Sequence, residues 1–394
     1  MKLSTVFKEF FESEKAGGFV LIFSAAVALL LTNNGAAGWM QHLIHTRLNL
    51  SFASVHLDLT FLHWVNDGLM AIFFLLVGLE IKRELYEGEL ATFNNAVLPF
   101  CAAVGGMIVP AAIHYFLNRG MASESGFGIP MATDIAFALG VLSLGGKSVP
   151  PSLKVFLAAF AIIDDLGAIV VIALFYSKAL AMKYLLLALA LFAGMIIMSA
   201  LKFRFIFLYL LLGLFMWYAM LQSGIHATIA GILLAFALPF GRSVDHRNSP
   251  TLQHFLHKPV AFLILPLFAF VNTAIVLPSS IGQAVFTSNS LGIIAGLVIG
   301  KFAGITLTCF LTIRLGIGKL PANMNRRHLI GAALLGGIGF TMSIFITNLA
   351  FTDDLIIINS KISILIASII AAITGLLVLS GRKNNEIPVS GRES

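Results

Sequence analysis

The stretch AIIDDLGAIVVIALF, Ala161–Phe175, places two adjacent carboxylates, Asp164 and Asp165, inside an apolar run long enough to cross a bilayer. A lone aspartate at the centre of a membrane helix costs about 2.5–3.5 kcal/mol on insertion scales. Such residues are accepted where they face a partner, a water-filled cavity or a transported ion. We therefore expect this stretch to contain both a spanning helix and a functional site.

Comparable apolar runs recur along the whole chain. Hydrophobic residues make up 59% of the 394 residues and charged residues only 11%, whereas soluble proteins carry about 25% charged residues. Only helices and closed barrels can cross lipid, and runs of about twenty apolar residues fit a spanning helix. We expect an all-α membrane protein with a single integral membrane domain over residues 1–394. Its twelve expected spans are 17–35, 61–81, 95–117, 126–145, 152–176, 182–201, 204–220, 223–240, 259–278, 291–313, 328–351 and 358–380.

The distribution of basic residues predicts the orientation of these spans. With the N-terminus in the cytoplasm, 19 of the 25 Lys and Arg residues lie in cytoplasmic segments, five lie in outer segments, and Lys301 lies within a span. This excess follows the positive-inside rule. Both termini, residues 1–16 and the tail 381–394, are therefore expected in the cytoplasm. The net charge of +7 is explained by topology, so membrane lipid is an expected partner and nucleic acid is not.

The first outer loop has a period-two pattern. LNLSFASVHLDL, Leu48–Leu59, alternates apolar and polar residues around Ala53-Ser54, which predicts a short β-hairpin. Two interpretations remain open. The hairpin is either an ordered lid over the outer face or an exposed edge that pairs with a second copy of the chain.

Four ionisable residues share one depth near the middle of three different spans: Asp134, Asp164, Asp165 and Lys301. A purely structural ion pair is a poor explanation, because one lysine cannot neutralise three carboxylates. Successive helix residues point about 100° apart. One of the two adjacent aspartates is therefore expected to pair with Lys301 while the other faces a cavity. Asp67 and Glu80 lie nearer to span ends, where a solvated carboxylate is the simpler interpretation.

Two spans contain interruptions. GFGIPMATDIAFALG, Gly126–Gly140, and LLGGIGFTMSIF, Leu334–Phe345, each combine three glycines with polar residues. Paired interrupted segments of opposite orientation indicate a transporter site built from inverted repeats. A break exposes half-helix ends with partial charges, which Asp134 would compensate at the positive ends and Lys301 at the negative ends. Glycines that merely allow close helix packing are the alternative.

The available ligand atoms favour a small hard cation. Carboxylate, hydroxyl and backbone carbonyl oxygens suit Na⁺-like ions, and competition between Na⁺ and H⁺ for the same carboxylates would couple their movements. No phosphate loop and no Cys/His metal cluster occur in the sequence, so we expect a transporter without a cofactor and not an enzyme. A Na⁺-coupled symporter of an organic substrate is the alternative. An intramembrane aspartyl protease fits poorly, because adjacent aspartates on one helix diverge.

Five motifs resemble the NhaA family of bacterial Na⁺/H⁺ antiporters: ATDIAFALG, AIIDDLGA, GLEIKREL, SGIHATIAG and GIGFTMSIF. The similarity runs from Gly17 to about Ser380, and this family is itself one of the cases behind the rule on interrupted segments. The resemblance implies twelve helices in the bacterial inner membrane and exchange of cytoplasmic Na⁺ or Li⁺ for external H⁺ by alternating access. It also implies electrogenic, pH-regulated transport and a homodimer held partly by the outer hairpin 48–59.

The same resemblance implies roles for individual residues. Asp164 and Asp165 would form the ion and proton site, Lys301 would pair with Asp164, and Thr133 and Asp134 would lie where the unwound helices cross. The family's pH-sensing positions match five residues: Glu80, Glu84, Gln253, His254 and His257. The family usually has a glutamate in place of Gln253, which leaves the pH midpoint open. His226 is either a satisfied interfacial histidine or a further pH-response residue.

Overall fold

The computed structural model describes residues 3–52, 56–146, 149–176, 180–240 and 248–380. The hairpin tip at Ala53-Ser54, the first two residues and the tail 381–394 lie outside the described residues. Within the described part, the chain is mostly helical and contains one pair of antiparallel strands. The all-α membrane class expected from the sequence is confirmed at this level.

Nine helical segments in the described part are long and apolar enough to cross a membrane. Several of them join an α-helix to a π-helical turn, labelled η1, η6 and η7. The nine segments lie in α1 (Leu3–Asn33), α3–η1–α4 (Phe61–His63, Trp64–Leu69, Met70–Tyr86), α5 (Phe93–Asn118), α7 (Pro151–Phe175), α8 (Met182–Ala200), α9 (Ile206–Ser223), α11–η6–α12 (Asn248–Pro259, Val260–Ile264, Leu265–Thr273), α14–η7–α15 (Ser288–Ala295, Gly296–Gly300, Lys301–Arg314) and α18 (Asp354–Ser380). The remaining short elements are α2 (Ala37–His45), η2 (Glu89–Ala91) and α13 (Ile281–Val285).

The two interrupted segments form bent pairs. The 3₁₀ helix η3 (Glu124–Met131) and α6 (Ile135–Leu144) meet at 42°, and α16 (Arg326–Leu335) and α17 (Phe340–Ala350) meet at 40°. Counting each pair as one span gives up to eleven spans in the described residues. The expected span 223–240 contains only α10 (Ile229–Ala237), a helix of nine residues. The count of twelve therefore stays a prediction.

Local contacts explain why α10 is short. The preceding helix α9 ends at Ser223, and the next residue is Gly224, whose φ of 85° lies in the left-handed region that favours glycine. At its other end, the Lys82 ammonium on α4 donates hydrogen bonds to the carbonyl oxygens of Phe236 and Leu238, at 2.8 and 2.5 Å. A cation at a helix C-terminus compensates the partial negative charge there. Lys82 is therefore buried against α10, although its position suggested a cytoplasmic loop.

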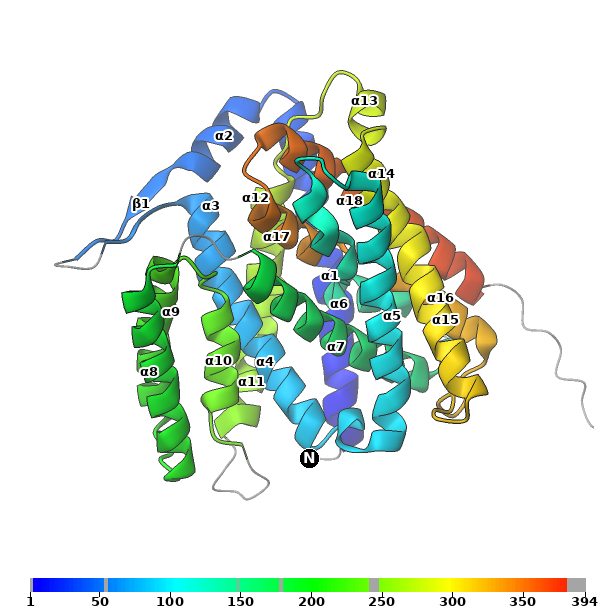
Figure 1. Ribbon diagram of the computed structural model, residues 1–394, viewed down its shortest axis with the longest axis horizontal. Coiled ribbons are helices and arrows are strands. Elements are labelled where there is room, and N and C mark those ends of the chain that lie inside the picture. The colour runs from blue at the N-terminus through cyan, green and yellow to red at the C-terminus, as the bar shows by residue number, and fades with distance from the viewer. Residues whose placement is uncertain (1–2, 53–55, 147–148, 177–179, 241–247, 381–394) are drawn as a thin grey trace, which may run out of the picture.

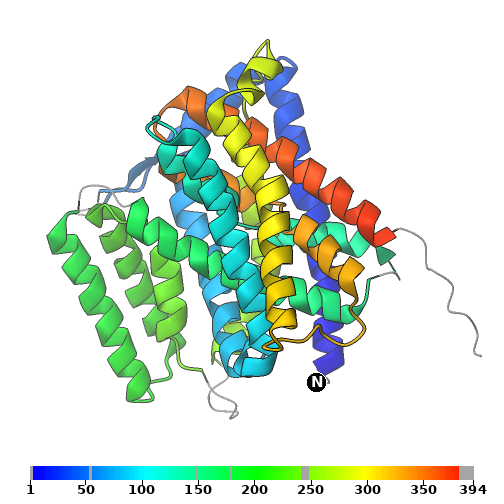
Figure 2. The same ribbon diagram turned by 45° about the vertical axis from the view of Figure 1, so that its right-hand side comes forward.

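The helices that carry the buried charges lie at the centre of the molecule. In both views α8, α9 and α10 stand together on one side, whereas α7 crosses the middle of the molecule and passes behind α5 (Figure 1, Figure 2). Close contact between α5 and α15 depends on two glycines, because a Cβ on Gly105 would come within 2.4 Å of the Gly304 carbonyl oxygen. This contact holds the first turn of α15, and with it Lys301, against the interior.

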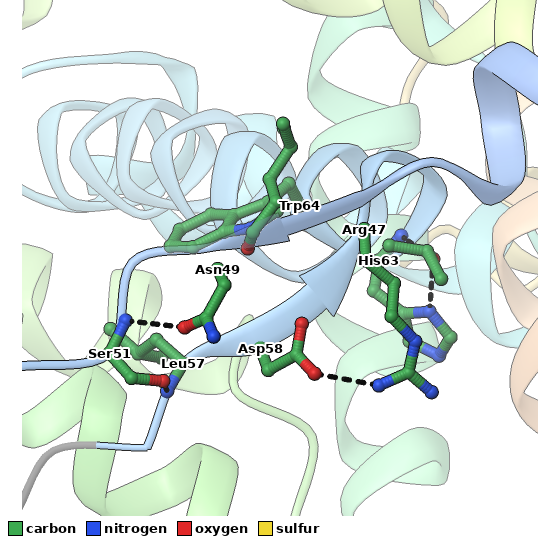
Figure 3. Close-up of polar contacts among 9 residues, drawn as sticks. Arg47, Asn49, Ser51, Leu57, Asp58, His63 and Trp64 are labelled. Atoms are coloured by element: carbon green, nitrogen blue, oxygen red, sulfur yellow. Dashed lines mark hydrogen bonds and ion pairs between the residues drawn. The ribbon is translucent and has the colours of Figure 1, made fainter.

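The predicted outer hairpin is present as two three-residue strands. Strand β1 (Arg47–Asn49) pairs with β2 (Asp58–Thr60) in antiparallel register, with Leu48 opposite Leu59. Arg47 and Asp58 form an ion pair at 2.7 Å across the strands (Figure 3). Leu50 and Phe52, which lead towards the tip, are exposed. Pairing of this hairpin with a second copy stays a prediction.

Candidate functional site

The Asp164 carboxylate and the Lys301 ammonium form an ion pair in the interior. Oδ2 of Asp164 lies 2.5 Å from Nζ of Lys301, and both side chains are 0% exposed. Lys301 is the first residue of α15, directly after the π-helical turn η7, and Nζ also lies 5.4 Å from the ring centroid of Phe160 on α7. Removing one partner would leave an uncompensated buried charge, a change that costs about 3–5 kcal/mol in other proteins.

Asp165 is buried beside this pair and lacks a hydrogen-bond partner. It is 1% exposed, and among the described residues no donor reaches either of its carboxylate oxygens. Its main electrostatic neighbours are the carboxylates of Asp164 and Asp134, opposed by the Lys301 ammonium. The two aspartates therefore have different surroundings, as the angle of about 100° between successive helix residues predicted. Asp164 pairs with Lys301, and Asp165 faces a cavity. A buried carboxyl group without a partner is unfavourable, which makes Asp165 suited to bind a proton or a cation.

A cavity of about 60 Å³ is lined by Asp165 and by residues of α4 from Phe73 to Glu80. This part of α4 runs towards the end of the bundle that carries the N-terminus (Figure 1). One water molecule needs about 10–15 Å³ by this measure, so the cavity has room for several. The polar groups in its wall come from five residues: Glu80, Asp134, Asp165, His257 and Thr341. The cavity thus connects Glu80 with Asp165, and the rest of its wall is apolar.

The two interrupted segments meet at their breaks. The Asp134 amide donates to the Ile338 carbonyl at 2.7 Å, and the Thr133 hydroxyl donates to the Gly336 carbonyl at 2.8 Å. In return, the Ser343 hydroxyl on α17 donates to the Ile129 carbonyl in η3 at 2.7 Å. Each segment thus satisfies backbone carbonyls that the other leaves without helical partners.

Asp134 compensates two positive helix ends at once. Its Oδ1 accepts a hydrogen bond from the Phe137 amide in the first turn of α6, at 2.9 Å. Its Oδ2 accepts from the amide and the hydroxyl of Thr341 at the start of α17, at 3.0 and 2.5 Å. A carboxylate at a helix N-terminus is favoured by the helix dipole. The expected position of Asp134 at positive half-helix ends is therefore observed.

The Lys301 ammonium pairs with a carboxylate and not with the negative half-helix ends that the sequence pattern suggested as its partners. Its partner is Asp164, and the negative half-helix ends receive neutral donors from the opposite break. Thr133 lies beside the Asp164 carboxylate as well, so that the ion pair and the break of η3 and α6 are adjacent. Neutral hydroxyl and amide groups donate to the backbone carbonyls at the breaks, so the Lys301 ammonium is available to pair with the Asp164 carboxylate.

Two polar contacts around the site escaped the sequence analysis. Ser368 on α18 accepts a hydrogen bond from the Phe340 amide at 3.2 Å. On the other side of the break, Asn272 donates to Asn66 at 2.8 Å and accepts from Asn348 at 2.7 Å. Asn348 lies about two turns beyond Thr341 on α17. The sequence does show a glycine, Gly339, at the start of α17 and isolated asparagines in apolar runs. Neither feature identifies the residue that completes the hydrogen bond.

The five pH-response positions differ in their surroundings. Gln253 is buried on α11 and its side chain hydrogen-bonds to Glu80, whereas Glu84 pairs with Arg83 at 2.8 Å. His257 lines the cavity and the His254 side chain is exposed. Glu80 is only partly exposed, because α11 packs against this end of α4. The structure therefore brings Glu80, Gln253 and His257 to the mouth of the route to Asp165.

His226 lies far from that group. Its Nε2 is 2.9 Å from the Tyr176 carbonyl at the end of α7, and the Tyr176 hydroxyl donates to the Ser125 carbonyl at 2.7 Å. The same hydroxyl accepts from the Gly128 amide in η3 at 3.1 Å. His226 is thus a hydrogen-bonded histidine that joins the start of α10 to the end of α7. Its second interpretation, a role in the pH response, stays a prediction.

A protein-family model described as Na⁺/H⁺ antiporter 1 matches residues 8–379 of this chain. The chain is 53% identical to the Na⁺/H⁺ antiporter NhaA of Flavobacterium psychrophilum, over 98% of this chain and 99% of that protein. It is 54% identical to the Na⁺/H⁺ antiporter NhaA of Dechloromonas aromatica, over 98% of both chains. Identity to the protein of that name from Cytophaga hutchinsonii is 52%, over 96% of both chains.

Proposed function

The chain belongs to the Na⁺/H⁺ antiporter 1 family, and we propose that it exchanges Na⁺ for H⁺ through the carboxylates of Asp164 and Asp165. Exchange of these two ions is the activity named for relatives of more than 50% identity over nearly the whole chain. The Na⁺-coupled symporter is not favoured by these relatives. The observation that carries the assignment to residues is the buried Asp165, which has no hydrogen-bond partner among the described residues. It lies in the wall of a cavity that also reaches Glu80, beside the ion pair of Asp164 and Lys301.

The first half of the cycle starts from the arrangement seen here. With the cavity open towards Glu80, Asp165 loses its proton and attracts Na⁺ or Li⁺, because an ionised carboxylate is a good ligand for a hard cation. Asp164 then turns an oxygen towards the ion, with Thr133 nearby as a further oxygen ligand. Lys301 loses its partner in this step. Its buried ammonium then favours release of a proton or a change of position, since an unpaired buried charge is unfavourable.

The second half of the cycle needs access from the other side of the membrane. We place the moving parts at the two breaks, whose backbone groups bond to each other and can exchange partners when the segments shift. The contacts between Asn66, Asn272 and Asn348 lie on the side of the break away from the cavity. Opening on that side lets external protons displace Na⁺ from the carboxylates. Alternating access of this kind, with inverted repeats and crossing helices, is part of the proposal.

Charge balance makes the exchange electrogenic in this scheme. Two aspartates and Lys301 together can carry more than one proton for each Na⁺ that leaves, so that net positive charge enters the cell. The orientation follows the positive-inside pattern of the loops, with both termini in the cytoplasm of a bacterial inner membrane. We further propose that Glu80, Gln253 and His257 regulate entry to the cavity as the pH changes, with Glu84, His254 and His226 as further pH-response residues.

The outer hairpin supports a homodimer. Strands β1 and β2 each have three residues, and their exposed edges offer unpaired backbone groups that a second copy can use. Leu50 and Phe52 add exposed apolar side chains near the tip. Chemical cross-linking between cysteines placed at the edge of β1 would test this arrangement in membranes.

The experiment that tests the function uses inside-out membrane vesicles from an antiporter-deficient strain. Respiration acidifies the vesicles, and a pH-sensitive acridine dye reports proton efflux when NaCl, LiCl or KCl is added. We expect recovery of fluorescence with Na⁺ and Li⁺ in the wild-type chain and none in Asp165→Asn. Normal exchange by the Asp165→Asn chain would overturn the assignment of the site, and no recovery by a correctly inserted wild-type chain would overturn the exchange itself.

A further inference from the structure

A second, apolar groove lies apart from the ion site. It runs between α4 with its preceding turn η1, α9 and α10, and its volume is about 460 Å³. This is within the range of ligand pockets, about 300–1,000 Å³. Every residue that lines it is apolar or glycine. Two of the three walls belong to segments long and apolar enough to cross a membrane, Phe61–Tyr86 and Ile206–Ser223, so the groove is expected to face lipid.

The groove is elongated along the membrane normal. On the first wall it is lined by residues spaced three or four apart from Phe61 to Leu75, which is one face of a helix over a length of about 21 Å at 1.5 Å per residue. One leaflet of hydrocarbon is about 15 Å thick, half of the bilayer core. The groove therefore has the length and direction of an extended acyl chain that enters from the outer leaflet.

Two tryptophans form the outer end of the groove, and the indole N–H of each one already donates a hydrogen bond to a backbone carbonyl. The rings of Trp64 and Trp217 stack with centroids 6.0 Å apart. Trp64 Nε1 donates to the Leu48 carbonyl of strand β1 at 3.2 Å, and Trp217 Nε1 donates to the Asp67 carbonyl at 2.9 Å. Figure 3 shows Trp64 beside this strand. The two indoles present their apolar faces to the groove, and such rings are typical of the membrane–water interface.

Small residues let the three walls pack closely around the groove, and its outer side is open. Gly68, Gly213 and Gly231 lie in the three walls, and a Cβ on Gly213 would come within 2.5 Å of the Leu234 side chain. Leu214 in the α9 wall is 59% exposed. Hydrocarbon from the bilayer can therefore enter from the side without displacing a helix.

We propose that this groove binds one acyl chain of a membrane phospholipid. Burial of methylene groups alone gives no preference for the groove, because hydrocarbon is already available in the bilayer. Retention of the chain therefore depends on its fit between the three walls and under the tryptophan pair. The exposed Leu50 and Phe52 of a second copy are the competing occupants. They fit less well, because a hairpin at the membrane surface would have to reach the level of Leu75, about 21 Å below Phe61.

The three tryptophans of the chain provide the test. Trp64 and Trp217 line the groove, whereas Trp39 is exposed at the start of the outer loop. The Trp39→Phe chain therefore reports only on the groove, and the Trp64→Phe/Trp217→Phe chain reports only on Trp39. Both would be reconstituted in phospholipid with brominated acyl chains, which quench tryptophan fluorescence on contact. The vesicles would then be fused with a large excess of unbrominated phospholipid.

We expect part of the quenching in the Trp39→Phe chain to remain after this dilution, whereas quenching of Trp39 is fully lost. Filling the groove with Ile72→Phe and Leu214→Phe should remove the retained part. Leu211→Phe on the same helix, at a position outside the groove, should leave it. Complete recovery of fluorescence in the Trp39→Phe chain would overturn the proposal and show only bulk lipid at the groove. Quenching that develops only after Leu50 and Phe52 are replaced by serine would overturn it in favour of a second copy.

Discussion

Thr341 donates both its backbone amide and its hydroxyl to the carboxylate of Asp134, at 3.0 and 2.5 Å. The two residues are 207 positions apart and belong to different interrupted segments. A hydrogen bond to a charged group contributes about 1.5–3 kcal/mol. We expect Thr341→Val, which removes the hydroxyl, to raise the Na⁺ concentration for half-maximal exchange about tenfold.

Dye recovery in vesicles as a function of NaCl concentration measures this effect. Thr341→Ser keeps the hydroxyl and is the matched control, so it should stay close to the wild-type value. A Thr341→Val chain with unchanged half-maximal concentration and rate would show that the hydroxyl contact has no part in holding the two breaks together.

Ser368 should position α17 without contacting the ion. The N-cap of α17 is Gly339, which has no side chain to accept the first amide, and Ser368 on α18 accepts the Phe340 amide instead. A buried amide without a partner costs about 1–3 kcal/mol. We expect Ser368→Ala to lower the thermal midpoint of the purified protein by several degrees and to reduce the rate of exchange, whereas Ser368→Thr keeps an acceptor and restores both.

The matched control for this prediction lies on the same helix. Ser363 is also buried, but its hydroxyl donates within α18, to the Asn359 carbonyl at 2.8 Å. Ser363→Ala should therefore have a small effect on exchange. Equal losses of exchange in Ser363→Ala and Ser368→Ala would indicate a general sensitivity of α18 and remove the special role of Ser368.

These contacts show what the sequence could and could not predict. The apolar runs, the two breaks and the depth of Asp164, Asp165 and Lys301 follow from spacing along the chain, because a bilayer sets the length of each span. The partner of a buried polar group depends instead on which helices become neighbours. Hence the contact between Ser368 and Phe340, and that between Lys82 and α10, could not be read from local patterns. The apolar run at 223–240 continues beyond the nine helical residues of α10, so its assignment as a full span stays a prediction.

The contact between α5 and α15 can be tested at Gly105. A methyl group there would meet the Gly304 carbonyl oxygen at 2.4 Å, so the two helices must separate. Lys301 lies one turn before Gly304, and its 2.5 Å contact with Asp164 depends on the position of α15. We expect Gly105→Ala to destabilise the protein by about 1–3 kcal/mol, as overpacking does in other cores, and to reduce exchange strongly.

Gly194 on α8 is the matched control, because nothing lies within 4 Å of a Cβ built on it. Gly194→Ala should leave the thermal midpoint and the exchange rate unchanged or slightly raise the midpoint, since alanine favours a helix over glycine. Thermal unfolding in detergent and dye recovery in vesicles measure the two effects. A Gly105→Ala chain as stable and active as Gly194→Ala would contradict the close contact.

Gln253 offers a direct test of pH regulation. Its side chain hydrogen-bonds to Glu80 at the mouth of the cavity, and the Gln253→Glu chain would place two carboxylates in contact. Two ionised carboxylates at such a distance repel each other, so the pair retains a shared proton to higher pH than a single carboxylate does. If release of that proton opens the route to Asp165, the pH profile of exchange should move towards alkaline pH by about one unit, a shift within the range that neighbouring charges produce. Gln253→Ala removes only a hydrogen bond that favours the ionised Glu80 carboxylate, so it should shift the profile in the same direction but by much less than Gln253→Glu. Identical pH profiles for the Gln253→Glu and wild-type chains would exclude Glu80 and Gln253 from control of the exchange.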